Sequence, residues 1–332
     1  MRRIEWAGLL EVLAVILLGL ALAGFGPALL GLQLSNPLAT LTPESLPPSW
    51  LPLVLPMLQL LLVQYGAQFL VIAIVLIVGR RWIRPADGLG RDSKSTPRLV
   101  LLAFLAAIVA FPPVRILMEA GRVWDLAPAG PPWREALLSA PLTGDFYLFM
   151  AVLSFGVVPV LEEALYRGYV QGRLQATFRS SWMPLVLTSV LFTFLHSQYL
   201  GVDAFSLATT AMLFGLSMVL GVLYRQTGSL LPSILVHALI NLPMSTGVTL
   251  GVATALTVAG AIWRKALLAW IRQALATIRP IDIRPSHLLA IAVMLVTTLL
   301  IPVKPLWALT LGPVFLVVFV VLGRGTLARR RA

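Results

Sequence analysis

The sequence contains no cysteine. This absence excludes disulfide bonds, thiolate nucleophiles and zinc sites built on cysteine ligands. Histidine is scarce as well, because the 332 residues include only three. Any chemistry that needs an imidazole therefore has few candidate residues.

Charged residues are also few, at 11% of the chain against about 25% in soluble domains. Hydrophobic residues make up 59%, and the mean hydropathy is +0.92. So much apolar surface cannot be buried inside a water-soluble domain, so lipid must solvate a large part of it. Because backbone groups in lipid must bond within their own segment or within a closed barrel, long apolar runs favour helices. We predict an all-α, polytopic transmembrane helix bundle.

Apolar runs of about 20 residues, the length that spans a bilayer core, set the number of spans. We expect about ten spans (in the range of eight to ten). The candidate ranges are 7–31, 57–79, 99–118, 146–165, 184–202, 204–224, 229–245, 246–263, 287–303 and 306–323.

The formal net charge of +12 is distributed as in membrane proteins, and we therefore predict no nucleic-acid partner. With ten spans, every basic residue except Arg115, Arg122, Arg134 and Lys304 falls on the side of both termini. Cytoplasmic loops accumulate Lys and Arg. This predicts a multi-pass protein with both termini cytoplasmic, most simply in the cytoplasmic membrane of a prokaryote. The sequence carries no signal for oligomeric state.

Two neighbouring glutamates, Glu162 and Glu163, continue an apolar helix and are followed by Arg167. Intramembrane carboxylates are energetically costly and usually mark function. Glu163 and Arg167 are four residues apart and can pair on one helix face, whereas Glu162 points about 100° away from Glu163. The two carboxylates should therefore have different roles. A charge cluster at a cytoplasmic helix end is an alternative interpretation.

The next apolar segments carry two of the three histidines. Phe192 and His196 are four residues apart, well inside an apolar run, and His237 and Asn241 have the same spacing. Phe192 and His196 share a helix face, so the ring is expected to pack beside the imidazole. A lone membrane histidine, or a pair such as His237 and Asn241, is alone typical of hydrogen bonds between membrane helices. Together with the glutamates they supply a general base, a second proton-handling group and hydrogen-bond donors, as water-mediated amide hydrolysis requires.

These three motifs, in this order, resemble those of the intramembrane glutamic endopeptidases. That family comprises the CAAX prenyl proteases and bacteriocin-processing or immunity proteins, abbreviated CPBP. The resemblance implies that Glu162 and His196 activate a water, and that His237 and Asn241 stabilise the oxyanion. Glu163, Arg167 and Phe192 would support them. It also implies a membrane-associated peptide or protein substrate and no cofactor.

The resemblance divides the chain into three parts. Residues 1–140 would hold N-terminal transmembrane segments and a basic cytoplasmic loop, and residues 141–245 the protease core. Residues 246–332 would hold further transmembrane segments and an interfacial basic helix, because Lys265, Arg272 and Arg279 recur at seven-residue intervals in an apolar stretch. A cytoplasmic helix without a lipid role fits that pattern equally well.

Rival functions remain open on the residues alone. One is a zinc-dependent protease, since a glutamate and two histidines can ligate zinc with water in the fourth position. Others are a non-catalytic scaffold or immunity protein that uses the same cavity, and a small-solute transporter. Against a transporter, the sequence shows no inverted repeat.

The expected spans create one conflict. Measured along spans 146–165 and 184–202, Glu162 and His196 differ in depth by about 12 Å. A single water cannot bridge that distance, so a shared site requires helix tilt, a longer fourth helix or a recessed start to the fifth.

Overall fold

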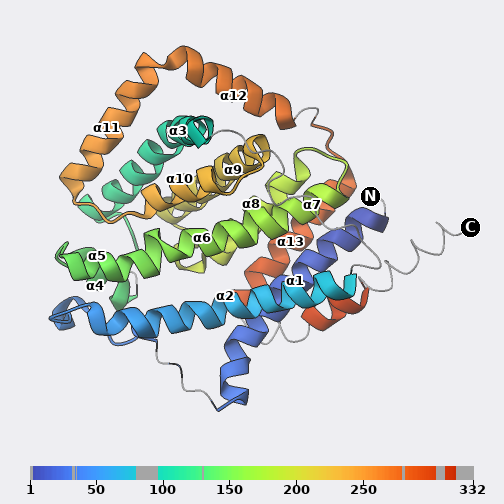
Figure 1. Cartoon of the computed structure of the whole chain (residues 1–332), viewed down its shortest axis with the longest axis horizontal. Helices are drawn as coiled ribbons and strands as arrows, with labels where there is room; N and C mark the ends of the chain where they lie inside the picture. Colours follow the sequence, from blue (N-terminus) through green and yellow to red (C-terminus); the bar gives the residue numbers. More distant parts are fainter. Residues whose placement is uncertain are drawn as a thin grey trace, which may run out of the picture.

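The computed structural model describes residues 3–31, 34, 36–79, 96–128, 131–278, 281–303 and 311–318. Within these residues the chain forms helices and no strand, which confirms the all-α class (Figure 1). Three helices precede the central segment: α1 (Arg3–Leu29), α2 (Leu51–Gly79) and α3 (Thr96–Val123), with the 3₁₀ turn η1 (Pro43–Ser45) between the first two. The short helix α4 (Pro132–Ser139) leads into the central segment.

The central segment is one continuous helical rod, Gly144–Thr177. It consists of α5 (Gly144–Met150), η2 (Ala151–Phe155), α6 (Val157–Glu163), η3 (Ala164–Gln171) and α7 (Gly172–Thr177). The pieces η2 and η3 are π-helical, with i to i+5 hydrogen bonds. Figure 1 shows this rod running through the middle of the bundle beside α2.

The remaining helices complete the bundle. They are α8 (Met183–Leu195), α9 (Ala204–Thr227), α10 (Leu231–Asn241), α11 (Thr246–Ile262), α12 (Arg264–Ile278) and α13 (Pro285–Val303), with the 3₁₀ turn η4 (Ser197–Tyr199) after α8. Residues 311–318 are also helical. Helix α8 contacts η3, and α10 contacts both η2 and α6, so these two helices lie directly against the glutamate-bearing part of the rod.

Five described helices are long and apolar enough to cross a membrane, or six if the α11–α12 pair, bent by 87°, counts as one span. The chain is thus a multi-pass membrane protein, but the expected count of about ten spans is not confirmed. Expected spans 184–202 and 229–245 are the shorter helices α8, 13 residues, and α10, 11 residues. At 1.5 Å per residue each is well below the roughly 30 Å of a bilayer core. Part of the expected span 306–323 lies outside the described residues.

The rod also corrects the expected end of the fourth span at residue 165. The helix continues to Thr177, and Arg167 and Arg173 lie on it with 0% and 3% of their surface exposed. These two arginines are therefore not part of a basic cytoplasmic loop. Arg173 instead forms a buried two-pronged ion pair with Glu11 of α1, at 2.8 and 2.6 Å. This pair fixes α1 against the end of the rod.

Close helix contacts reinforce that arrangement. Gly8 of α1 faces Thr177 so closely that a Cβ would lie 2.3 Å from the threonine Oγ1. Aromatic packing holds the other end of the rod, where Trp50 lies 5.0 Å from Phe146 and 5.2 Å from Phe149, between ring centroids. The rod is thus fixed at both ends, and its middle carries the glutamates.

Candidate active site

The paired glutamates lie in α6, a short α-helical stretch between the two π-helical pieces η2 and η3. Glu162 is 8% exposed and Glu163 is fully buried. Each π-helical stretch changes the register of the side chains that follow it, and such bulges are frequent at functional sites. Gly156 permits the first one, because a Cβ there would lie 2.4 Å from the carbonyl oxygen of Ala151.

Glu162 faces both histidines. Its Oε2 lies 3.9 Å from Nε2 of His196 and 3.8 Å from Nε2 of His237. Its other oxygen, Oε1, accepts a hydrogen bond of 2.9 Å from the hydroxyl of Tyr65. Oε2 is buried and has no hydrogen-bond partner among the described residues. One carboxylate oxygen is therefore anchored, and the other points between two imidazoles.

This geometry removes the expected 12 Å difference in depth. Glu162 lies 15 residues before the end of the rod at Thr177, and His196 follows Met183, the first residue of α8, by 13 residues. Because the rod and α8 are joined by a short turn and contact one another, the two side chains reach the same level. The mismatch came from the span boundary at residue 165, which placed Glu162 at a helix end.

Glu163 is the centre of a second, buried ion pair. Its Oε1 accepts a hydrogen bond of 2.9 Å from Nη1 of Arg167 and lies 2.9 Å from Nδ1 of His237. The predicted Glu163–Arg167 pair is therefore present. Arg167 also donates to the hydroxyl of Ser217 on α9, at 2.9 Å, and its guanidinium lies 4.7 Å from the ring centroid of Phe192. These contacts join the rod to α8, α9 and α10.

The partners of the two Nδ1 atoms define the tautomers. Nδ1 of His196 lies 2.7 Å from the carbonyl oxygen of Phe192, which can only accept. Nδ1 of His237 faces the Glu163 carboxylate. Both Nδ1 atoms therefore carry the proton, and in the neutral rings both Nε2 atoms are acceptors directed at Glu162.

His196 is positioned differently from the expectation. It is not well inside an apolar helix but directly follows Leu195, the last residue of α8, where its amide caps the helix end. The predicted contact with Phe192 is present, with 4.5 Å between ring centroids. At the helix end the imidazole is 18% exposed, more than that of His237 at 4%.

Asn241 does not contact the Glu162 cluster through any hydrogen bond of the described residues. Its Nδ2 donates to the backbone carbonyl of Ser154 at 3.2 Å, and the Ser154 hydroxyl donates to the Asn241 carbonyl at 3.2 Å. This reciprocal pair ties the end of α10 to η2. A side-chain amide has two N–H donors, so one remains for another acceptor.

Tyr65 is the contact that the sequence did not reveal. It lies 97 residues from Glu162 in the chain and belongs to no motif with it. Its only signal is local: it is a polar hydroxyl within the buried stripe of α2, whose neighbours are Leu61, Gln68 and Ile72. A buried phenol needs a partner, but the stripe does not say which.

In the described part of the chain, no group of three His, Asp or Glu side chains is arranged to hold a metal ion. The cluster of Glu162, His196 and His237 has the donor types that zinc prefers, but its nitrogen–oxygen separations of 3.8 and 3.9 Å are wide for a common ion.

Comparison with known proteins identifies the segment that carries this cluster. Residues 144–243 match the family model described as type II CAAX prenyl endopeptidase Rce1-like. This segment is thus similar to a CAAX-protease domain. It includes the paired glutamates and both histidine motifs, and it indicates a membrane-embedded peptide hydrolase.

A second comparison finds a relative that is less informative. The chain is 29% identical over 175 residues, 52% of its length, to an uncharacterised 24.3 kDa protein of Escherichia coli, of which the match covers 74%. No solved structure matches the chain.

Proposed function

We propose that the protein is a glutamic-type intramembrane endopeptidase, in which Glu162 and His196 activate a water for attack on a peptide carbonyl. The observation that carries the proposal is the buried Oε2 of Glu162, which lies near two imidazole nitrogens and accepts no hydrogen bond from the described residues. Separations of 3.8–3.9 Å are too long for direct hydrogen bonds, so a water would have to join Oε2 to an imidazole.

The net charge of the buried cluster suggests which side chain carries a proton before the reaction. Two carboxylates and one guanidinium leave a net charge of −1 if both histidines are neutral. Burying an unbalanced charge is costly, so a proton on one histidine would balance the cluster. His237 is the better placed, because its Nδ1 already donates to Glu163. Protonated, its Nε2 becomes a donor that faces the reacting centre.

The proposed hydrolysis has two steps. Glu162 takes a proton from the water as the hydroxide attacks the peptide carbonyl, with His196 holding the water through Nε2. The carbonyl electrons move to the oxygen, and Nε2–H of His237 and the remaining N–H of Asn241 stabilise that oxyanion. When the C–N bond breaks, the proton on Glu162 passes to the leaving amine. Glu163 and Arg167 hold His237 and the rod in place.

The substrate class that we propose is a membrane-associated protein or peptide, because the site lies among membrane helices. The family name points to a prenylated C-terminus as one candidate. We also propose the cytoplasmic membrane of a prokaryote, with both termini cytoplasmic. In support, the first residues of α1, the last of α2 and the α7–α8 turn lie at the same end of the bundle (Figure 1).

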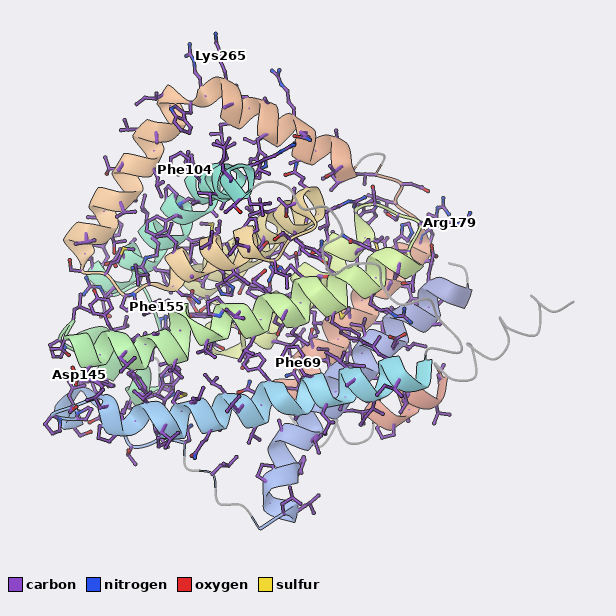
Figure 2. All side chains as sticks on the ribbon, viewed as in Figure 1. Phe69, Phe104, Asp145, Phe155, Arg179 and Lys265 are labelled. Atoms are coloured by element: carbon purple, nitrogen blue, oxygen red, sulfur yellow. The ribbon has the colours of Figure 1, made fainter. Side chains whose placement is uncertain are left out.

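Helix α12 is another basic segment, and the exposure of its charged residues supports a position at the membrane surface. Trp270 points inward, where its Nε1 donates to Gln226 at 2.8 Å, while Lys265 and Arg272 are exposed. Figure 2 shows Lys265 pointing away from the bundle. Because such side chains are costly in hydrocarbon, we propose that this exposed face of α12 meets lipid headgroups.

The proposed activity is tested with the wild type and Glu162→Gln. Membrane proteomes of cells carrying either form are compared for uncleaved proteins, and the purified proteins are assayed on a fluorogenic farnesylated CAAX peptide and its unprenylated form. We expect cleavage products only with the wild type, and activity that survives chelators. Identical proteomes and no peptide cleavage would favour a scaffold, and inhibition by a chelator that zinc reverses would favour the metal mechanism.

A further inference from the structure

Tyr65 contacts the proposed catalytic carboxylate from outside the matched domain. It lies on α2, whereas the family match begins at residue 144. Its hydroxyl donates to Oε1 of Glu162 at 2.9 Å, and the two residues are 7% and 8% exposed. A carboxylate only accepts, so the direction of this hydrogen bond is fixed. Through this hydrogen bond, helix α2 contacts the reacting centre.

The spacing of buried residues along α2 determines which way the Tyr65 side chain points. Buried residues recur every three or four positions along the helix, at Met57, Leu61, Tyr65, Gln68 and Ile72. This period keeps one face against the bundle. The first half of α2 packs against α5 and η2, the part of the rod that leads into α6. Tyr65 is near the middle of the stripe, so its ring is held by packing and its hydroxyl extends to Glu162.

The hydrogen bond distinguishes the two oxygens of Glu162. Oε1 accepts the hydrogen bond from Tyr65, while Oε2 faces the Nε2 atoms of His196 and His237 and has no hydrogen-bond partner in the part of the chain that the structure describes. A carboxylate held at one oxygen cannot turn freely about its last side-chain bond. A phenol is also a neutral donor, so it favours the ionised carboxylate without adding a charge to the cluster.

We infer that Tyr65 is a positioning residue for the hydrolysis: it fixes the Glu162 carboxylate so that Oε2 meets the attacking water. The inference rests on the function proposed above. It also assigns a role to a helix outside the matched domain. Without the hydrogen bond from α2, the Glu162 carboxylate would be less restricted in its orientation.

The test is Tyr65→Phe, which keeps the ring and removes the donor. Its matched control is Tyr169→Phe, because the Tyr169 hydroxyl donates to another buried carboxylate, that of Glu11, at 3.2 Å. Both variants lose one phenol–carboxylate hydrogen bond in the same bundle. On the peptide that the wild type cleaves, we expect Tyr65→Phe to lower kcat about 10- to 100-fold with KM unchanged. Tyr169→Phe should stay within about twofold of the wild type.

A second readout needs no substrate. Infrared difference spectra of the protein in lipid, wild type minus Glu162→Gln, isolate the carboxylate bands of Glu162. We expect these bands to shift in Tyr65→Phe and to stay in place in Tyr169→Phe. Unshifted bands in Tyr65→Phe, or equal losses of kcat in both variants, would overturn the role of Tyr65. Full activity of Glu162→Gln would instead refute the proposed function, whatever the bands show.

Discussion

The buried Glu163–Arg167 pair gives the sharpest stability prediction, through the change Arg167→Met. Both side chains are fully buried and 2.9 Å apart. Methionine removes the guanidinium, its two hydrogen bonds to Ser217 and its contact with the Phe192 ring. Within the described residues, the Glu163 carboxylate then keeps His237 alone as a partner. Breaking a buried pair from one side costs about 3–5 kcal/mol, because the other charge stays buried. We expect a loss of that size.

The matched control is Arg122→Met. Arg122 pairs with Glu119 at 3.1 Å, but its side chain is 43% exposed, and such a surface pair contributes about 0–1 kcal/mol. Free energies of unfolding are measured by titrating the purified proteins in mixed micelles with increasing fractions of sodium dodecyl sulfate. Adding Glu163→Gln to Arg167→Met should recover part of the loss, because it removes the uncompensated charge. Equal costs for the two methionine variants, or a double variant less stable than Arg167→Met, would refute the reasoning.

Two further predictions concern the rod and α12. Gly156→Ala should cost about 1–3 kcal/mol and lower peptide cleavage, because its Cβ would meet the Ala151 carbonyl at 2.4 Å. Gly215→Ala, where a Cβ meets nothing within 4 Å, is the control and should be neutral or stabilising in the same titration. For α12, the change is the replacement of Lys265 and Arg272 by Glu. The thermal stability of the protein is measured in nanodiscs of phosphatidylglycerol and of phosphatidylcholine, and the extra stability in the anionic lipid should fall by about 1 kcal/mol for each charge replaced. An unchanged preference for the anionic lipid would show that this face does not meet headgroups.

The sequence was sufficient for the features that depend on local spacing. A four-residue interval on a helix predicted the Glu163–Arg167 pair and the contact between Phe192 and His196, and both are present. Composition was sufficient for the all-α membrane class, because so apolar a chain has few other ways to satisfy its backbone. These conclusions need no knowledge of how the helices pack.

Helix ends were the weakest part of the sequence prediction. Hydropathy alone ended the fourth span near residue 165, because Arg167 and Arg173 looked like loop residues. Both arginines stay on the helix, since buried carboxylates, Glu163 on the same rod and Glu11 on α1, balance their charges. In the same way α8 ends before His196, although the apolar run continues. Charge and hydropathy do not show which ionised groups have buried partners.

The meeting of Glu162 with three ring side chains was decided by tertiary structure alone. Tyr65, His196 and His237 come from three helices, and only their packing around the rod directs one glutamate oxygen to a phenol and the other to two imidazoles. The sequence by itself determined which residue types were available and which pairs share a helix face, because those follow from helix geometry. The distance between helices far apart in the chain follows from packing of the whole bundle, and that distance is what makes four separate side chains one site.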